Sequence, residues 1–347
     1  MMLALRKTST AFGLDVVEVD EPGPPAAHEV QIEIAATGIC GSDLHVYEST
    51  PGYEFMHDRL PVTLGHEFAG TVAAAGSATT SFRVGDRVTA WPTTACGDCF
   101  HCRAERPQDC QAREVIGLHI DGGFAARVNV PAGNCYRLPE GLDLDLAALS
   151  EPLSIAENAL DVGECAAGDA VVVLGPGPIG VALAWLAQHR GCAPVLLAGL
   201  HDSGRLALAR RMGVEHCVDL ADEPLADAVQ RVFSRPVDRV IEATGVVDSV
   251  HQGLAVLRSS GILVVAGIHS QPIEIPLTQL VRDKKQLRAA HDTKAAAWPR
   301  VLAVLAEHGE RLSEMITDRL PLADAIDGFE RARNRDAMKI LLKPETT

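Results

Sequence analysis

Positive charge is scarce in this chain. Lys and Arg number 31 against 46 Asp and Glu, so the formal net charge at pH 7 is −15, and no run of basic residues offsets it. A chain this acidic repels the phosphates of nucleic acids and the anionic head groups of lipids. We therefore expect neither a nucleic acid nor a membrane as a partner.

We also expect no targeting or membrane-spanning segment in this sequence. No apolar stretch follows Arg6 and Lys7, so we expect no signal peptide and a cytoplasmic location. The charge-free span 170–188 contains Gly and Pro in its middle, which favours a buried strand, a turn and a helix start over a membrane helix. The chain has no repeats or low-complexity region, and its 347 residues exceed one ordinary core, so we expect two domains.

Of the nine cysteines, four lie within fifteen residues, at Cys96, Cys99, Cys102 and Cys110. In a chain without a secretion signal, this crowding indicates a metal site rather than disulfides. Four thiolates at these spacings can close a tetrahedron around Zn²⁺ with no position left for water, so we predict a structural zinc site. An iron–sulfur cluster and a chance spacing are the alternatives.

The hydrophobic pattern changes near residue 155. Before it, short alternating or apolar runs at 29–36, 68–74 and 87–89 are separated by turn residues, which predicts an irregular, barrel-like β domain. After it, strands and helices alternate, which predicts a parallel sheet with helices on both faces. The expected strands are 170–174, 194–198, 239–243 and 261–266, the expected helices are 179–189, 205–212, 249–257, 298–307 and 322–333, and a final strand is expected at 338–342.

A second, dispersed set of donors fits a catalytic metal. Cys40, His66 and Glu67 lie beside glycines and would supply mixed S, N and O ligands, with Glu151 as a candidate for the remaining position. Zinc in such a site polarises an alcohol or carbonyl oxygen. Ser42 and His45 suit a relay that carries the hydroxyl proton to water. The alternative is that these side chains only pack.

A glycine-rich turn follows the apolar strand at 170–174. In Gly175-Pro-Gly177-Pro178-Ile179-Gly180, the glycines would allow a tight turn, the approach of a pyrophosphate and close packing of the next helix, which predicts a dinucleotide site.

The acid that should bind the ribose about 20 residues further on is absent, since Gly199 stands there. Asp202 could reach the ribose, or Arg205 could accept a 2′-phosphate, or both could face solvent. The choice between NAD and NADP stays open at this point.

Together these motifs resemble the zinc-dependent medium-chain dehydrogenases, in the branch of the sorbitol (polyol) and threonine dehydrogenases. The resemblance runs nearly end to end. It includes Gly38-Ile-Cys-Gly-Ser-Asp-Leu-His45, Gly65-His-Glu-Phe-Ala-Gly70, Val84-Gly-Asp-Arg-Val88, Asp121-Gly-Gly-Phe124, Glu151-Pro-Leu153 and Lys339-Ile-Leu-Leu-Lys-Pro344.

The resemblance implies an α/β fold with a GroES-like, β-rich catalytic domain (1–155, with the zinc lobe at about 92–112), a Rossmann domain (156–289) and a return to the catalytic domain (290–347). It implies two zinc ions per chain, NAD or NADP as cofactor, and hydride transfer between the substrate carbon and the nicotinamide. Thr244, Gly245, Ala266, Gly267 and Ile268 would line the nicotinamide. A homodimer or homotetramer is expected.

The expected substrate is a secondary alcohol of the polyol, sugar alcohol or cyclitol class, interconverted with its ketone. The stretch 290–294 departs from the threonine dehydrogenase pattern, and Trp298-Pro299 echoes the polyol enzymes. An L-threonine 3-dehydrogenase is the alternative, and a non-catalytic, zinc-stabilised nucleotide-binding protein is the alternative from another class. The segment 47–58, with Tyr47, Tyr53, Phe55 and His57, shapes a substrate pocket or is a mobile surface loop.

Overall fold

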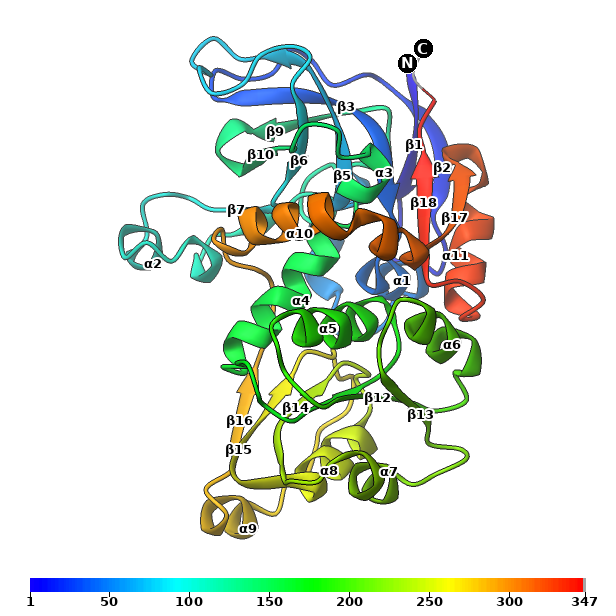
Figure 1. Ribbon diagram of the computed structural model, residues 1–347. Coiled ribbons are helices and arrows are strands. Elements are labelled where there is room, and N and C mark those ends of the chain that lie inside the picture. Colours follow the sequence, from blue (N-terminus) through cyan, green and yellow to red (C-terminus); the bar gives the residue numbers. More distant parts are fainter. Residues whose placement is uncertain (346–347) are drawn as a thin grey trace. The chain divides into compact units, whose positions relative to one another are not determined.

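The chain folds into two compact units, and the first is discontinuous in sequence (Figure 1). The computed structural model describes residues 1–345. Unit 1 consists of Met1–Glu151 and the chain from Lys294 onward, and unit 2 consists of Pro152–Thr293.

The main sheet of unit 1 joins the two ends of the chain. Its strand order is β10-β6-β5-β3-β18-β17, and β9 also pairs with β3. In the long strand β3 every second side chain from Val30 to Ile34 is buried in an apolar cluster, as the alternating pattern predicts. The last strand runs antiparallel to β3, with Leu341 opposite Gly38, so the C-terminal segment completes a sheet begun by the N-terminal one. The strands are β3 (Glu29–Gly38), β5 (Glu67–Ala75), β6 (Arg87–Ala90), β9 (Arg127–Pro131), β10 (Cys135–Arg137), β17 (Ile316–Pro321) and β18 (Lys339–Lys343).

Smaller elements surround this sheet. The helix expected at 298–307 continues to Leu312 with a kink at His308, and the one expected at 322–333 begins as a 3-10 turn. The remaining strands are β1 (Met2–Lys7), β2 (Asp15–Val19), β4 (Val62–Thr63), β7 (Thr93–Thr94) and β8 (Glu114–Val115). The helices are α1 (Gly41–Glu48), α2 (Phe100–Arg103), α3 (Leu144–Ala147), α10 (Ala297–Leu312) and α11 (Ala325–Arg333), with 3-10 turns η1 (Glu54–Arg59), η2 (Pro107–Asp109), η3 (Ala132–Asn134), η4 (Ser313–Met315) and η5 (Leu322–Asp324).

Unit 2 is a doubly wound parallel sheet. Its six strands lie in the order β13-β12-β11-β14-β15-β16, and every pair is parallel. This is the Rossmann order, in which the first strand of the unit lies in the middle of the sheet. Within this unit, α5 and α6 lie on one side of the strands and α7 and α8 on the other (Figure 1). The strands are β11 (Val171–Leu174), β12 (Val195–Gly199), β13 (His216–Asp219), β14 (Val237–Glu242), β15 (Leu257–Val265) and β16 (Gln286–Ala289), and the helices are α4 (Ser150–Val162), α5 (Pro178–His189), α6 (Ser203–Arg211), α7 (Leu225–Val232), α8 (Val247–Val256) and α9 (Leu277–Arg282).

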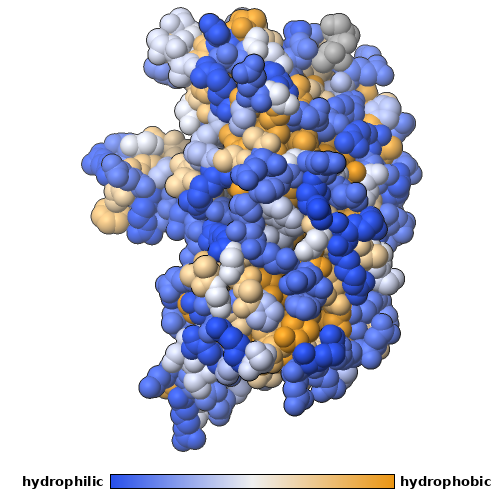
Figure 2. Space-filling model, viewed as in Figure 1, coloured by the Kyte–Doolittle hydropathy of each residue, from blue (hydrophilic) through white to orange (hydrophobic). Residues whose placement is uncertain are grey.

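Polar residues predominate on the face shown in Figure 2, in keeping with the high net charge of the chain. The apolar central strand β11 is fully buried, so the charge-free span that contains it is a core strand followed by a helix. Within residues 1–345, none of the helices is long and apolar enough to cross a membrane.

Candidate active site

Three of the predicted zinc ligands meet in unit 1. Cys40 immediately precedes α1, whereas His66 and Glu67 lie at the start of β5, next to the end of β3. One donor atom from each lies within 4.8 Å of the other two, and both His66 and Glu67 are buried. A thiol, an imidazole and a carboxylate that converge this closely form a donor set typical of zinc sites.

The carboxylate of Glu67 is held by a lysine from the last strand. Lys339 Nζ donates to both oxygens of Glu67, at 2.8 and 2.6 Å, and to the carbonyl oxygen of Ile39 at 2.9 Å. Both side chains are almost fully buried. A Cβ at Gly38 would come within 2.2 Å of a Glu67 oxygen, so only glycine leaves room for the carboxylate beside β3. Lys339 belongs to the closing motif of the sequence, but its local pattern gave no sign of this role.

The site carries more acidic groups than this lysine can neutralise. Burial and the Glu67 carboxylate raise the pKa of the Cys40 thiol to about 12. Burial likewise raises the pKa of Asp43 to about 6 and that of Glu151 well above its ordinary value. Burial works against a positive charge on His66, but Asp43 and Glu151 outweigh it and raise the pKa of His66. A bound cation would relieve this mutual repulsion, so the donor set fits a divalent metal.

Asp43 is a site residue that the sequence analysis missed. Its carboxylate accepts from the backbone amide of Cys40 at 2.9 Å, and its other oxygen lies 3.5 Å from His66 Nδ1. A carboxylate behind a metal-binding imidazole fixes the orientation of the ring. Its place in the sequence could have indicated this role, because Asp43 lies three residues after Cys40, in the first turn of the helix that Cys40 precedes.

The two residues expected to form a proton relay have different partners. Ser42 Oγ lies 3.2 Å from His66 Nε2, and His45 Nδ1 lies 3.0 Å from Thr50 Oγ1. Since the Thr50 hydroxyl donates its proton to the His45 carbonyl oxygen, it accepts from Nδ1–H. Burial lowers the pKa of His45, which favours the neutral ring. The Nε2 atom of that ring is then an acceptor.

The four clustered cysteines converge in a separate lobe around α2, which is conspicuous in Figure 1. Four distances between their sulfur atoms are 3.5, 3.5, 3.8 and 3.9 Å. A tetrahedron with Zn–S bonds of about 2.3 Å has edges of about 3.8 Å, so the lobe has the dimensions of a closed Cys₄ zinc site. The backbone amides of Cys96 and Cys99 also point at sulfur atoms.

The predicted dinucleotide turn joins β11 to α5 in unit 2. Gly177 precedes the first helical residues, Pro178 and Ile179. A Cβ at Gly180 would lie 1.7 Å from the carbonyl oxygen of Gly175, so the helix can approach the strand only because Gly180 has no side chain. The amides at the start of this helix are suited to a pyrophosphate.

Gly199, at the end of β12, stands where an acid that binds the ribose was expected. Pro176 leaves no room for a side chain at this position. A Cβ at Gly199 would lie 2.7 Å from Pro176 Cγ and 3.3 Å from Asp202 Cβ. The loop that follows is held by Asp219, which accepts from the amides of His201 and Asp202 at 2.9 and 3.1 Å. Arg205 lies on α6, with Nη1 3.9 Å from Asp202. Asp219 lies at the end of the following strand, β13, so no local pattern in the sequence links it to this loop.

Two further loops of unit 2 are joined by a buried carboxylate. Glu242, at the end of β14, accepts from the amide and hydroxyl of Thr244 and, at 2.9 Å, from the amide of Gly245. Its other oxygen lies 2.9 Å from His269 Nε2. A Cβ at Gly267 would come within 2.2 Å of the Gly245 amide nitrogen, so these loops touch through glycines. The segments at 244–245 and 266–268, expected to line the nicotinamide, therefore lie together, with the Ile268 side chain exposed.

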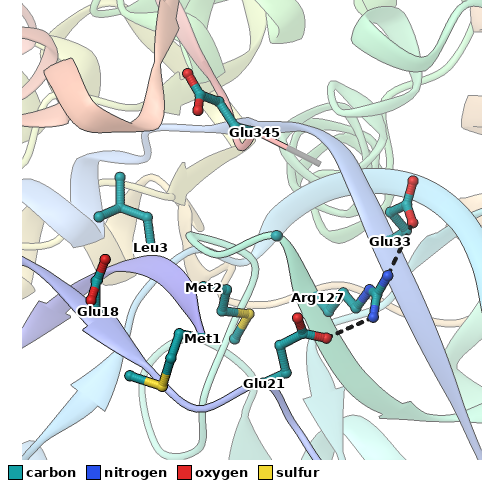
Figure 3. Close-up of a pocket in the computed structure, with 9 residues that line it drawn as sticks. Met1, Met2, Leu3, Glu18, Glu21, Glu33, Arg127 and Glu345 are labelled. Atoms are coloured by element: carbon teal, nitrogen blue, oxygen red, sulfur yellow. Dashed lines mark hydrogen bonds and ion pairs between the residues drawn. The ribbon is translucent and has the colours of Figure 1, made fainter. Parts of the chain in front are cut away.

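One cavity of unit 1 has a volume of about 190 Å³. It is lined by Met1, Met2, Leu3, Glu18, Glu21, Glu33, Ala126, Arg127 and Glu345, and contains none of the predicted site residues (Figure 3). Arg127 pairs there with Glu21 and Glu33 at 2.7 and 3.7 Å.

Comparison with known proteins agrees with this arrangement. Residues 26–140 match the alcohol dehydrogenase GroES-like domain, and residues 178–307 match the zinc-binding dehydrogenase domain. A sorbitol dehydrogenase from Halalkalibacterium halodurans is 32% identical over 99% of both chains, and an L-threonine 3-dehydrogenase from Saccharopolyspora erythraea is 32% identical over 98% of both. A zinc-binding dehydrogenase from Sinorhizobium meliloti, solved with NADP, superimposes with a TM-score of 0.88 at 31% identity, covering 99% of both chains.

The chain therefore belongs to the zinc-dependent medium-chain dehydrogenases. It is an oxidoreductase of the alcohol dehydrogenase type, and the expected fold of a GroES-like domain with a Rossmann domain is confirmed.

Replacing Lys339 should destabilise the protein far more than replacing Lys343, a half-exposed lysine of the same strand. Lys339→Met leaves Glu67 as a buried, unpaired charge, which should lower the free energy of unfolding by about 3 to 5 kcal/mol. Lys343→Met is the matched control, because Lys343 pairs with Asp145 near the surface and should contribute less than about 1 kcal/mol. Urea unfolding of both variants measures the difference, and equal losses would contradict the role given to Lys339.

Proposed function

We propose that this dehydrogenase interconverts a secondary alcohol of the polyol, sugar alcohol or cyclitol class with its ketone, using NAD or NADP. Unit 1 is the catalytic unit and unit 2 binds the nucleotide. The observation that carries the proposal is the buried convergence of Cys40, His66 and Glu67, with its surplus of acidic groups. Similarity to a sorbitol dehydrogenase along the whole chain supports the polyol class, and an L-threonine 3-dehydrogenase, equally 32% identical, is the alternative.

Catalytic zinc would be held by Cys40, His66 and a carboxylate. Both oxygens of Glu67 already accept hydrogen bonds from Lys339. Glu151 is buried, and its charge raises the pKa of His66. Glu151 is therefore the better candidate for the carboxylate ligand, and Glu67 is the alternative. When bound, zinc supplies a Lewis acid that polarises the substrate oxygen.

The protein side chains would move the hydroxyl proton. Ser42 lies next to His66 and is the candidate to take up the proton, and His45 offers an acceptor nitrogen at Nε2 on the same helix. Burial lowers the pKa of His45, so the ring is present in the neutral form that a proton relay needs as an acceptor.

The nucleotide would bind at the strand ends of unit 2, with the pyrophosphate at the start of α5 and the nicotinamide near the loops that Glu242 joins. The nicotinamide supplies the hydride acceptor. We also infer a homodimer or homotetramer. The sheet of unit 2 ends at β16, and Leu287 on this edge strand is 40% exposed, which favours pairing with a second copy.

The test of the function is a substrate panel. The zinc-loaded protein is assayed for nicotinamide reduction with polyols, cyclitols, L-threonine and simple secondary alcohols, each with NAD⁺ and NADP⁺. Turnover restricted to polyols or cyclitols supports the proposal, and turnover restricted to L-threonine assigns the chain to its threonine dehydrogenase relatives. No turnover with any alcohol would favour a non-catalytic nucleotide-binding protein.

Cys40→Ala should separate chemistry from nucleotide binding. Loss of a zinc ligand should lower kcat more than about 100-fold, because losing even a group behind a ligand costs 10 to 100-fold. NADH affinity, measured by fluorescence titration, should stay within about twofold, because the nucleotide groups lie in unit 2. Cys217→Ala, at a cysteine of unit 2, is the control. Equal loss of turnover and NADH binding would contradict a role for Cys40 in the chemistry.

Cys99→Ser should remove the structural metal, the second of two zinc ions per chain. We expect the zinc content to fall by about one ion per chain and the melting temperature to drop, because the metal contributes folding energy to the lobe. Cys217→Ser, the same substitution outside the lobe, should change neither. Unchanged zinc content in Cys99→Ser would show that the lobe holds no zinc.

The cofactor preference should respond to an acid at the end of β12. Gly199→Asp alone would press against Pro176, so the acid is introduced together with Pro176→Ala, and Pro176→Ala by itself is the control. Repulsion between this carboxylate and a 2′-phosphate should lower the ratio of kcat/KM for NADP⁺ over NAD⁺ at least about tenfold. An unchanged ratio would mean that the ribose does not bind at this strand end.

A further inference from the structure

The buried carboxylate of Glu242 has one partner that lies outside the residues expected to bind the nucleotide. Glu242 ends β14, and His269 lies in the loop 266–269 that follows β15. His269 Nε2 lies 2.9 Å from a Glu242 oxygen and, because a carboxylate only accepts, Nε2–H is the donor. The other ring nitrogen, Nδ1, is buried and has no hydrogen-bond partner within residues 1–345. Glu242 is therefore the polar contact that fixes this imidazole.

The Glu242–His269 pair, which we call the loop clamp, joins two loops whose backbones already touch. The first loop, 243–246, follows β14, and the Glu242 side chain accepts from two of its amides. Two amides of the second loop donate to the Glu242 carbonyl oxygen at 2.8 and 3.1 Å. A Cβ at Gly245 would lie 2.4 Å from the carbonyl oxygen of Ile268. The bond from His269 fixes the far end of the second loop to the same residue.

Each of the clamped loops carries one exposed apolar side chain. Val246 is 52% exposed and Ile268 is 53% exposed. Val246 directly follows Gly245, and Gly245 contacts the backbone of Ile268, so the two side chains come from adjoining segments. Apolar side chains beside a few fixed polar groups are typical of small-molecule sites. How these two side chains are placed depends on how the clamp holds the loops.

The clamp lies next to the turn expected to bind the pyrophosphate. A Cβ at Gly175 would lie 2.8 Å from Thr244 Cγ2, so the first glycine of that turn contacts the first clamped loop. The strands β12 and β14 flank β11 on opposite sides. A dinucleotide in this type of sheet extends across the carboxyl ends of the strands. With the adenosine ribose at the end of β12, the nicotinamide half lies at the ends of β14 and β15.

We propose that His269 is a positioning residue for the nicotinamide half of the cofactor. This inference rests on the nucleotide binding in the proposed function. His269 acts through Glu242: it holds the two loops together, so that Val246 and Ile268 present one apolar surface to the nicotinamide ring before the cofactor binds. Loops that are already ordered lose less freedom on binding, which raises the affinity for the nicotinamide half.

The test compares a reduced nucleotide with a ligand that lacks the nicotinamide. The zinc-loaded protein is titrated with NADH and ADP-ribose, or with NADPH and 2′-phospho-ADP-ribose if the wild type binds NADPH more tightly. The amide of His269→Asn is too short to reach Glu242. This variant should bind the reduced nucleotide at least about tenfold more weakly, the effect of losing one hydrogen bond to a charged group, and the ADP-ribose ligand less than about twofold more weakly.

Two further variants serve as controls. The longer amide of His269→Gln places an N–H near the position of Nε2, so its affinity for the reduced nucleotide should stay within about threefold of the wild type. His251→Asn makes the same substitution at an exposed histidine of α8, whose Nε2 lies 2.8 Å from the carbonyl oxygen of Glu274, and it should change neither affinity. For a variant too unstable to titrate, the rise in melting temperature caused by each ligand gives the same comparison.

Equal weakening of both ligands in His269→Asn, unchanged binding of the reduced nucleotide, or no rescue by His269→Gln would overturn the proposal. The titrations need no alcohol, so they are independent of the substrate panel. Binding by the wild type without turnover of any alcohol would refute the proposed reaction and leave the comparison of the variants valid. A wild type that binds neither ligand would refute the nucleotide site and this inference with it.

Discussion

The candidate active site depends on one buried ion pair, between Glu67 and Lys339. Burying either charge alone would be strongly unfavourable, so each side chain can occupy the interior only with the other in place. Burial opposes the charge of Lys339, but the Glu67 carboxylate outweighs burial and raises the pKa of Lys339, so this side chain stays an ammonium. The pair fixes the last strand against the strand end that precedes Cys40, and it requires glycine at position 38. The donors of the site therefore have their positions because the two ends of the chain meet.

Buried carboxylates organise both units in a similar way. In unit 1, Asp43 accepts from the Cys40 amide and faces His66, so it orients two donors at once. In unit 2, Glu242 collects the amides of one loop and the imidazole of another at the end of a central strand. Asp219, a half-buried carboxylate at the end of β13, holds the loop after β12 in a similar way. Each carboxylate contacts polar groups from two or more positions of the chain, which fixes the conformation of these segments through charge-assisted hydrogen bonds.

The sequence alone was sufficient for features that depend on neighbouring residues. The strand–turn–helix at 171–189 follows from one apolar run and three glycines, and the spacing of the cysteines indicates how their sulfurs converge. Contacts between residues that lie far apart in the sequence could not be predicted from it. Lys339 reaches Ile39 across 300 residues, and no local pattern assigns it a partner. Tyr47 looked like a pocket residue because its neighbours are aromatic, yet its hydroxyl bonds to Glu330 on α11. The steric closure of Gly199 by Pro176 likewise depends on how two turns pack.

The discontinuity of unit 1 has a consequence for how the protein forms during synthesis. All six strands of unit 2 lie within residues 171–289, so this sheet can close while the ribosome is still adding the final segment. The N-terminal strands, made first, must wait for β18, the last strand, because it supplies both their sheet neighbour and the counter-ion of Glu67. Until then a carboxylate and an open strand edge are exposed to solvent and to other nascent chains. Metal binding at the candidate site is therefore expected only after β18 has been synthesised and has supplied Lys339.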